Sequence, residues 1–174
     1  MQKSMLKVSK MLAVVARISL WLSGIGLVLM TALISWQVFG RFVLNDSPSW
    51  TEPLAVILMG WFVFLGAAVG IREGYHLSFD ILVMIVPPKG KLFLYSLSDM
   101  VIIAFASGMV YFGSSLAALA WAATLPSLGF PGGVAYLPIV LGGGLMVIFS
   151  IERLARRMAG LPTARFGETE PEAV

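Results

Sequence analysis

Long runs without a charged residue dominate the pattern of this chain. Residues 18–40 form one such run of 23 positions, and residues 53–71 form another of 19. A helix needs about 20 predominantly apolar residues to cross the hydrocarbon core of a bilayer. Each of these two runs therefore predicts one membrane-spanning helix. The first run is longer than the stretch of about 7–15 apolar residues in a secretory signal peptide, so we expect it to be retained.

A third run, residues 100–151, has 52 positions and is too long for one span. Its middle, LPSLGFPGGVAYLP at residues 125–138, is rich in proline and glycine, which end helices. The run therefore predicts two helices joined by a turn. We expect an all-α integral membrane protein with four transmembrane helices at about 14–40, 51–71, 97–125 and 134–157. They form one domain, residues 1–160, before a polar cytoplasmic tail at 161–174.

The segment between the second and third spans, GYHLSFDILVMIVPPKGK, is too short and too polar at its start to cross a membrane. Its large apolar residues, from Tyr75 and Phe79 to Leu82 and Ile85, recur at helical spacing. This spacing favours an amphipathic helix that lies in the membrane interface. A buried connector fits the pattern equally well.

Composition supports a membrane protein. Hydrophobic residues make up 59% of the chain and charged residues 12%, whereas about a quarter of the residues in soluble domains are charged. The net charge is +3, but the basic residues stand at the ends of the apolar runs without interleaved aromatic residues, so we expect no nucleic-acid partner. The absence of cysteine excludes disulfides and thiolate metal sites.

The distribution of lysine and arginine predicts the orientation. From the N-terminal tail through the three connections to the C-terminal tail, these residues number 4, 1, 3, 0 and 4. Cytoplasmic segments of membrane proteins carry the excess of positive charge. We therefore expect both termini in the cytoplasm.

The ionisable residues near the spans fall at predicted span ends. Glu52, Arg72 and Asp99 should reach headgroups and water there, which argues against an ion path through the chain. Glu52 suits the positive end of the second helix, next to an interfacial Trp50. The alternative is an ion pair between Glu52 and Arg41, which would fix the first two spans against each other or against a partner.

The sequence gives little support for a haem, zinc or catalytic site. His76 is the single histidine, and haem or zinc sites need more ligands of this kind. We expect no catalytic set, no metal and no cofactor, and therefore no enzyme. Gly66 and Gly70 form a small-xxx-small step that lets helices approach closely in lipid.

The order of these features resembles the small membrane subunit of the tripartite ATP-independent periplasmic (TRAP) transporters. The resemblance covers about residues 12–158. The matching positions are Arg41, Trp50, Glu52, Gly66, Ala67, Arg72, Gly74, His76 and Asp80. Two positions depart from the family pattern, because Pro53 replaces a second acidic residue and residues 54–60 lack a basic one.

The resemblance implies a four-span subunit in the bacterial inner membrane that braces a large elevator-type subunit. The partners would be this large subunit, a periplasmic substrate-binding protein and membrane lipids, in a sodium-coupled importer of organic anions. The residues with an expected structural or interface role are Arg41, Trp50, Glu52, Gly66, Gly70, Arg72, His76 and Asp80.

Two rival classes stay open. A self-sufficient four-span transporter that works as a dimer needs a carboxylate embedded in the membrane, for which Glu52 is the candidate. A membrane anchor for a redox enzyme is disfavoured by the single histidine.

Overall fold

A computed structural model describes residues 2–46, 48–74 and 88–160. These residues form four long helices, and no strand occurs among them, so the predicted all-α membrane fold is confirmed. The four helices are α1 (Gln2–Phe39), α2 (Thr51–Glu73), α4 (Pro88–Ala120) and α5 (Leu137–Met158). All four are long and apolar enough to span a membrane. Residues 75–87, which hold most of the expected interfacial helix, lie outside the described residues.

Two helices extend beyond the spans expected from the sequence. α1 begins at Gln2 instead of about residue 14, and α4 begins at Pro88 instead of about residue 97. Charged residues end the apolar pattern of a span, but lysine is a good helix former and does not end the helix. Proline is likewise tolerated in the first turn, where its missing N–H has no intrahelical partner.

The C-terminal ends of α1 and α4 are each followed by a defined backbone turn. α1 continues into a π-helical turn, Gly40–Leu44, which ends at Asn45 in the left-handed conformation. α4 ends at Ala120, five residues before the expected 125. The following turn is closed by hydrogen bonds between the Leu125 amide and the Phe130 carbonyl and between the Gly132 amide and the Ala123 carbonyl. A 3-10 turn, Gly132–Tyr136, then leads into α5.

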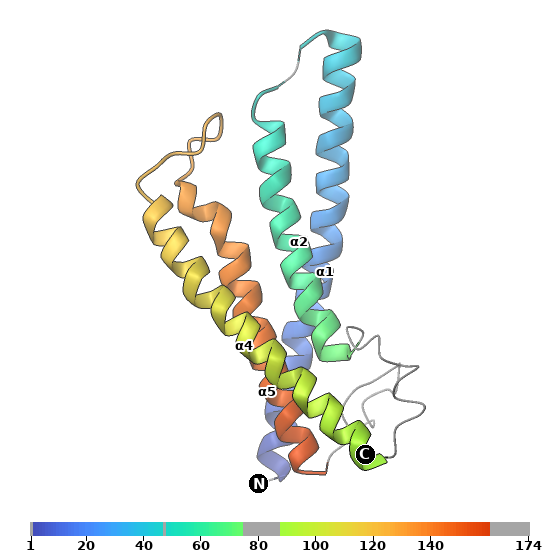
Figure 1. The fold of residues 1–174 in the computed structure, drawn as a ribbon. Helices are drawn as coiled ribbons and strands as arrows, with labels where there is room; N and C mark the ends of the chain where they lie inside the picture. The colour runs from blue at the N-terminus through green and yellow to red at the C-terminus, as the bar shows by residue number, and fades with distance from the viewer. Residues whose placement is uncertain (1, 47, 75–87, 161–174) are drawn as a thin grey trace.

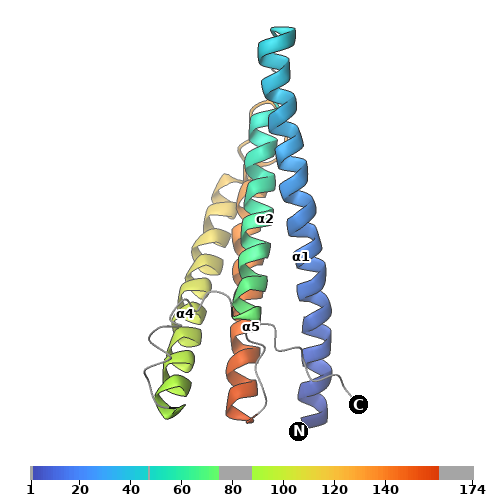
Figure 2. The ribbon, with the colours of Figure 1, turned by 90° about the vertical axis from the view of Figure 1, so that its right-hand side faces the viewer.

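The helices pack in the spatial order α1, α2, α5, α4 (Figures 1 and 2). α5 therefore lies between α2 and α4, although the segment that follows α2 in the chain leads into α4. The beginning of α1, the end of α2, the beginning of α4 and the end of α5 lie at one end of the bundle, which we call the charged end. Residues 45–46, 48–50 and 121–131 lie at the opposite loop end (Figure 1).

Contacts between α1 and α2 depend on small residues. The Ser23 hydroxyl donates a 2.7 Å hydrogen bond to the Phe62 carbonyl. A Cβ placed on Gly66 would lie 2.9 Å from the Ser23 Oγ, so glycine permits this approach. Gly70, in contrast, has no atom within 4 Å of such a Cβ. Only the first member of the predicted Gly66–Gly70 step therefore lies in a tight contact.

Consecutive glycines place α5 against both of its neighbours. A Cβ on Gly142 would lie 2.5 Å from the Phe64 Cβ of α2. A Cβ on Gly143 would lie 3.2 Å from the Ala106 carbonyl oxygen of α4. Because neither glycine has a side chain, the backbones of α2 and α4 approach α5 from two sides.

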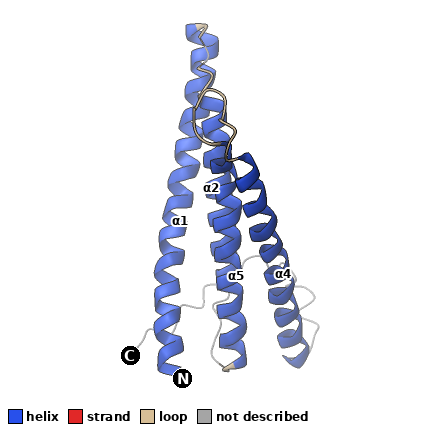
Figure 3. Ribbon diagram, turned by 90° about the vertical axis from the view of Figure 1, so that its left-hand side faces the viewer, coloured by secondary structure: helices blue, strands red, loops and turns tan. Residues whose placement is uncertain are grey.

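The helix pairs α1–α2 and α4–α5 are offset from each other along the bundle axis. Pro138, at the start of α5, contacts Gly60 in the middle of α2, while α1 rises beyond all other elements at the loop end (Figure 3). The buried hydrophobic core lies toward the charged end. Its members are Leu12, Ala16, Ala68, Val69, Ile71, Ala106, Met146 and Phe149.

Replacing Gly142 with alanine tests the close approach of α2 and α5. We expect Gly142→Ala to destabilise the protein by about 1–3 kcal/mol, because the new methyl group overlaps Phe64. The midpoint of thermal unfolding in detergent, followed by tryptophan fluorescence, measures this loss.

Gly144→Ala is the matched control, because a Cβ at Gly144 meets no atom within 4 Å. Alanine also has the higher helix propensity, so this control should unfold at the same temperature or a higher one. Equal unfolding temperatures for Gly142→Ala and the unmodified protein would contradict the packing.

Candidate functional site

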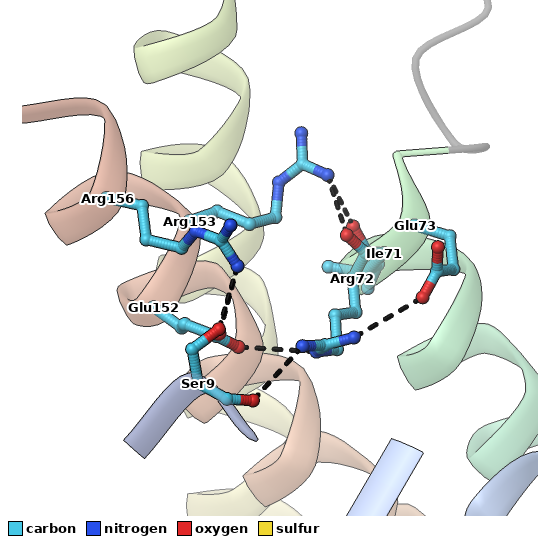
Figure 4. Close-up of polar contacts among 7 residues, drawn as sticks. All are labelled: Ser9, Ile71, Arg72, Glu73, Glu152, Arg153 and Arg156. Atoms are coloured by element: carbon cyan, nitrogen blue, oxygen red, sulfur yellow. Dashed lines mark hydrogen bonds and ion pairs between the residues drawn. The ribbon is translucent and has the colours of Figure 1, made fainter. Parts of the chain in front are cut away.

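Charged side chains from the helices gather at the charged end of the bundle (Figure 4). We call this group the charged cluster. Its members are Ser9, Arg72, Glu73, Asp99, Glu152, Arg153, Arg156 and Arg157. The cluster takes one residue from α1, two from α2, one from α4 and four from α5. It therefore links all four helices by polar contacts.

Arg72 connects α2 to α1 and α5. Its guanidinium approaches Glu152 at 3.3 Å and Glu73 at 3.4 Å, and it donates to the Ser9 carbonyl at 3.4 Å. It also lies over the Phe149 ring, 5.9 Å from the ring centroid. The planar guanidinium suits this role because its N–H groups point to several partners at once. The Arg72 side chain is 6% exposed.

Arg153 holds the end of α2 against α5 and α4. Its Nη1 donates 3.0 Å hydrogen bonds to the carbonyls of Ile71 and Arg72, and its Nε lies 3.3 Å from Asp99 Oδ1. The last carbonyls of a helix have no intrahelical donor and carry partial negative charge. Arg153 therefore caps α2 from a neighbouring helix, where Gly74 in the left-handed conformation ends it.

Asp99 accepts contacts from two cations of α5. Besides Arg153, it meets Arg157 Nη1 at 2.8 Å, and its side chain is fully buried. Arg157 also donates to the Ser96 hydroxyl at 3.2 Å. An ionised carboxylate without partners would be costly to bury, so these two guanidinium groups make its position possible.

Arg156 completes the contact between α5 and α1. It donates a 2.8 Å hydrogen bond to Ser9 Oγ and lies 3.7 Å from Glu152 one helical turn earlier. The cluster then contains four arginines and three carboxylates. Opposite charges therefore nearly cancel within the chain.

The burial of Arg72 and Asp99 corrects the sequence-based expectation for these residues. Both were expected to reach headgroups and water, but in the chain they are 6% and 0% exposed and contact other helices. The sequence contains one signal of this arrangement, a Glu152–Arg156 pair at helical spacing at the edge of an apolar run. The contact between Asp99 and Arg153 spans 54 positions and depends on the tertiary fold.

The alternative suggested by the sequence, an ion pair between Arg41 and Glu52, is not formed among the described residues. The π-helical turn carries Arg41 past the start of α2, and its guanidinium lies 6.0 Å from the Phe42 ring centroid. Glu52 lies exposed in the first turn of α2, and Trp50 immediately precedes this helix with 40% exposure. His76 and Asp80 fall outside the described residues.

The geometry of the cluster is that of a structural connection. Among residues 2–46, 48–74 and 88–160, no three His, Asp or Glu side chains form a group that could hold a metal ion. Each carboxylate of the cluster lies 3.4 Å or less from a guanidinium nitrogen. The charged cluster holds the ends of the four helices together.

The four apolar helices and their internal charged cluster define a multi-pass membrane protein. A family model of the tripartite ATP-independent periplasmic transporters, DctQ component, matches residues 30–160. The chain belongs to this family, and it is a component of a TRAP transporter in the inner membrane. The resemblance found in the sequence is thereby confirmed.

Individual relatives agree with this assignment. The chain is 31% identical over 133 residues to a Haemophilus influenzae protein named as a TRAP transporter small permease protein, covering 74% of the chain and 80% of the relative. It is 24% identical over 127 residues to the sialic acid TRAP transporter small permease protein SiaQ of Vibrio cholerae, with 73% of each covered. A shorter match, 32% over 60 residues, joins it to the C4-dicarboxylate small permease protein DctQ of the same species, covering 34% of the chain and 26% of the relative.

Neutralising Asp99 tests the importance of the cluster. We expect Asp99→Asn to destabilise the folded chain by about 3 kcal/mol, because two buried guanidinium groups lose their anionic partner. Chemical or thermal unfolding in detergent measures the loss.

Asp46→Asn is the matched control, since Asp46 is exposed at the loop end. This substitution should change the stability by no more than about 0.5 kcal/mol. If both variants unfold like the unmodified protein, the cluster does not hold the bundle together.

Proposed function

We propose that this chain is the scaffold subunit of a sodium-coupled importer of organic anions. In this role it braces a large elevator-type membrane subunit that carries the substrate and sodium sites. A periplasmic binding protein delivers the substrate. The names of two relatives support an organic anion, because sialic acid and C4-dicarboxylates both carry carboxylates.

The observation that carries this proposal is the placement of charge. Residues 18–40, 53–71 and 100–151 contain no charged residue, so the middle of the bundle offers none to an anion or to sodium. The buried carboxylates Asp99 and Glu152 face guanidinium groups of the same chain. A polar cluster that is largely neutralised internally suits a rigid support better than a transport site.

The self-sufficient dimeric transporter is the weaker candidate. That mechanism needs a carboxylate within the membrane that can bind and release a cation. Glu52 stands at the first turn of α2 and is exposed, while Asp99 is held by two arginines. Neither position matches that requirement.

The exposed ends of α1 and α2 suit contact with another subunit. Arg41, Trp50 and Glu52 are exposed at the loop end, where α1 rises beyond the α4–α5 hairpin. We assign Arg41 and Glu52 to contacts with the large subunit, since they do not pair with each other. Arg72 acts inside the chain as part of the cluster, and His76 and Asp80 are assigned to seating the connector at the cytoplasmic interface.

The excess of lysine and arginine in the segments at the charged end supports a cytoplasmic location for this end. Because the chain has no cysteine, single cysteines report this orientation without background. Cysteines at Ser49 and Ser127 should react with a membrane-impermeant maleimide on intact cells, and cysteines at Lys10 and Met158 should react only after lysis. Labelling of Lys10→Cys on intact cells would show that the orientation is opposite to the predicted one.

Reconstitution tests the scaffold role. The chain alone in proteoliposomes should take up neither succinate nor sialic acid under a sodium gradient. Together with the large subunit and the binding protein, it should support uptake of an organic anion that depends on the gradient. Uptake by the chain alone would favour the dimeric transporter.

In the same complex, Glu52→Gln should lower the amount of assembled complex or its maximal rate by up to about fivefold, the value of one exposed charge pair. The half-saturating concentrations of substrate and sodium should stay unchanged, because a support acts on the scaffold. Arg41→Lys retains the charge and serves as control. A change of about tenfold in either affinity, about 1.4 kcal/mol, would place Glu52 in the transport site.

A further inference from the structure

A groove of about 410 Å³ runs between α1 and α2 near the charged end. Ala16 and Leu20 of α1 and Gly66, Val69 and Gly70 of α2 line it. The groove is open at Gly70, where no atom lies within 4 Å of a Cβ built on the backbone, and it is bounded at Gly66 by the Ser23 hydroxyl. Its apolar lining continues up to two charged residues, one on each helix.

These two residues are Arg17 and Glu73, which also line the groove. Arg17 is exposed and forms no ion pair with any residue that the structure describes. Glu73 is 37% exposed and meets Arg72 through Oε1, which leaves Oε2 available to another donor. The groove therefore carries a cation and an anion on opposite walls.

The positions of the apolar runs lead us to expect both charges at the depth of lipid headgroups. Arg17 immediately precedes the charge-free run 18–40, and Glu73 follows the run 53–71 by two positions. α2 has 23 residues, about 34 Å at 1.5 Å per residue, which slightly exceeds the hydrocarbon thickness of about 30 Å. Leu20, Val69 and the two glycines then lie at the depth of the acyl chains.

We propose that this groove binds a phospholipid whose headgroup carries both a phosphodiester and a primary ammonium group, as in phosphatidylethanolamine. The Arg17 guanidinium suits the phosphate, to which it can donate two hydrogen bonds. Glu73 accepts from the ammonium group. One acyl chain fills the apolar groove beside Gly66 and Gly70.

The pairing of charges selects this headgroup over its common alternatives. A choline headgroup has the same charges but its quaternary ammonium has no N–H to donate to Glu73. A phosphatidylglycerol headgroup satisfies Arg17 but brings no cation to Glu73. A helix of another protein would have to supply an anion and a cation at matching positions, whereas this lipid carries both next to its acyl chains.

Native mass spectrometry of the full chain in detergent tests the proposal. The protein is incubated with equal amounts of dioleoyl phosphatidylethanolamine, phosphatidylcholine and phosphatidylglycerol, and the retained lipids are counted. Phosphatidylethanolamine should be retained about fivefold more than either other lipid. Glu73→Gln should remove most of this preference, whereas Arg17→Gln should lower the retention of all three lipids, because each of them carries the phosphate that Arg17 binds.

Two further variants separate lipid binding from folding. Lys10→Gln, an exposed residue of α1 that does not line the groove, should retain the preference. Gly70→Leu should fill the groove and reduce retention of phosphatidylethanolamine about fivefold, while the unfolding temperature changes little because its Cβ has no neighbour.

Equal retention of the three lipids would overturn the proposal. So would a Gly70→Leu variant that still binds phosphatidylethanolamine. If that variant instead loses only its copurification with the large subunit, the groove belongs to a protein contact. The lipid experiment uses the chain by itself, so its outcome is independent of the proposed transport function.

Discussion

The structure depends on how the charges at one end of the bundle neutralise each other. A bilayer offers no water to an ion within its core, so carboxylates and guanidinium groups near its edge must reach the headgroups or find partners. Here α5 supplies Arg153, Arg156 and Arg157, and the other helices supply what these cations bind. Arg153 has the central role because it binds Asp99 of α4 and the last carbonyls of α2.

The remaining length of the bundle is held by a different interaction. Above the cluster the helices approach through glycines, so van der Waals contact between backbones replaces charge. Gly142 and Gly143 are adjacent in sequence and contact α2 and α4 respectively. The contacts of α1 are restricted almost entirely to α2, and much of its remaining surface is apolar and exposed. A helix of this kind has ample surface for lipids and for another subunit.

These two features together suit the proposed scaffold role. The charge cluster and the glycine contacts keep the four helices in one arrangement, and they leave the middle of the chain without a charged group. Membership in the DctQ family makes the chain a transporter component. A lipid in the groove between α1 and α2 would add to this arrangement, since its phosphate would pair with Arg17 and its ammonium group would donate to the exposed Glu73 carboxylate.

The sequence by itself determined the number and type of the helices. Charge-free runs of about 20 residues are a local property, and so is the break by proline and glycine at residues 125–138. The order of Arg41, Trp50, Glu52 and the residues after α2 was also enough to identify the family. Helix ends were less well predicted. Residues 2–14 and 88–97 contain lysines, which end an apolar run, but these residues are helical because lysine does not end a helix.

The tertiary structure alone decided which charges are buried and what they bind. Asp99 and Arg72 stand at span ends in the sequence, where exposure to water was the natural expectation. The fold brings Arg153 to Asp99 across 54 positions and Glu152 to Arg72 across 80, because α5 inserts between α2 and α4. It also separates Arg41 from Glu52, although the two are neighbours at one membrane face, because α1 continues past the start of α2. Such pairings depend on helix order and offset, which the packing of glycines sets and no local pattern encodes.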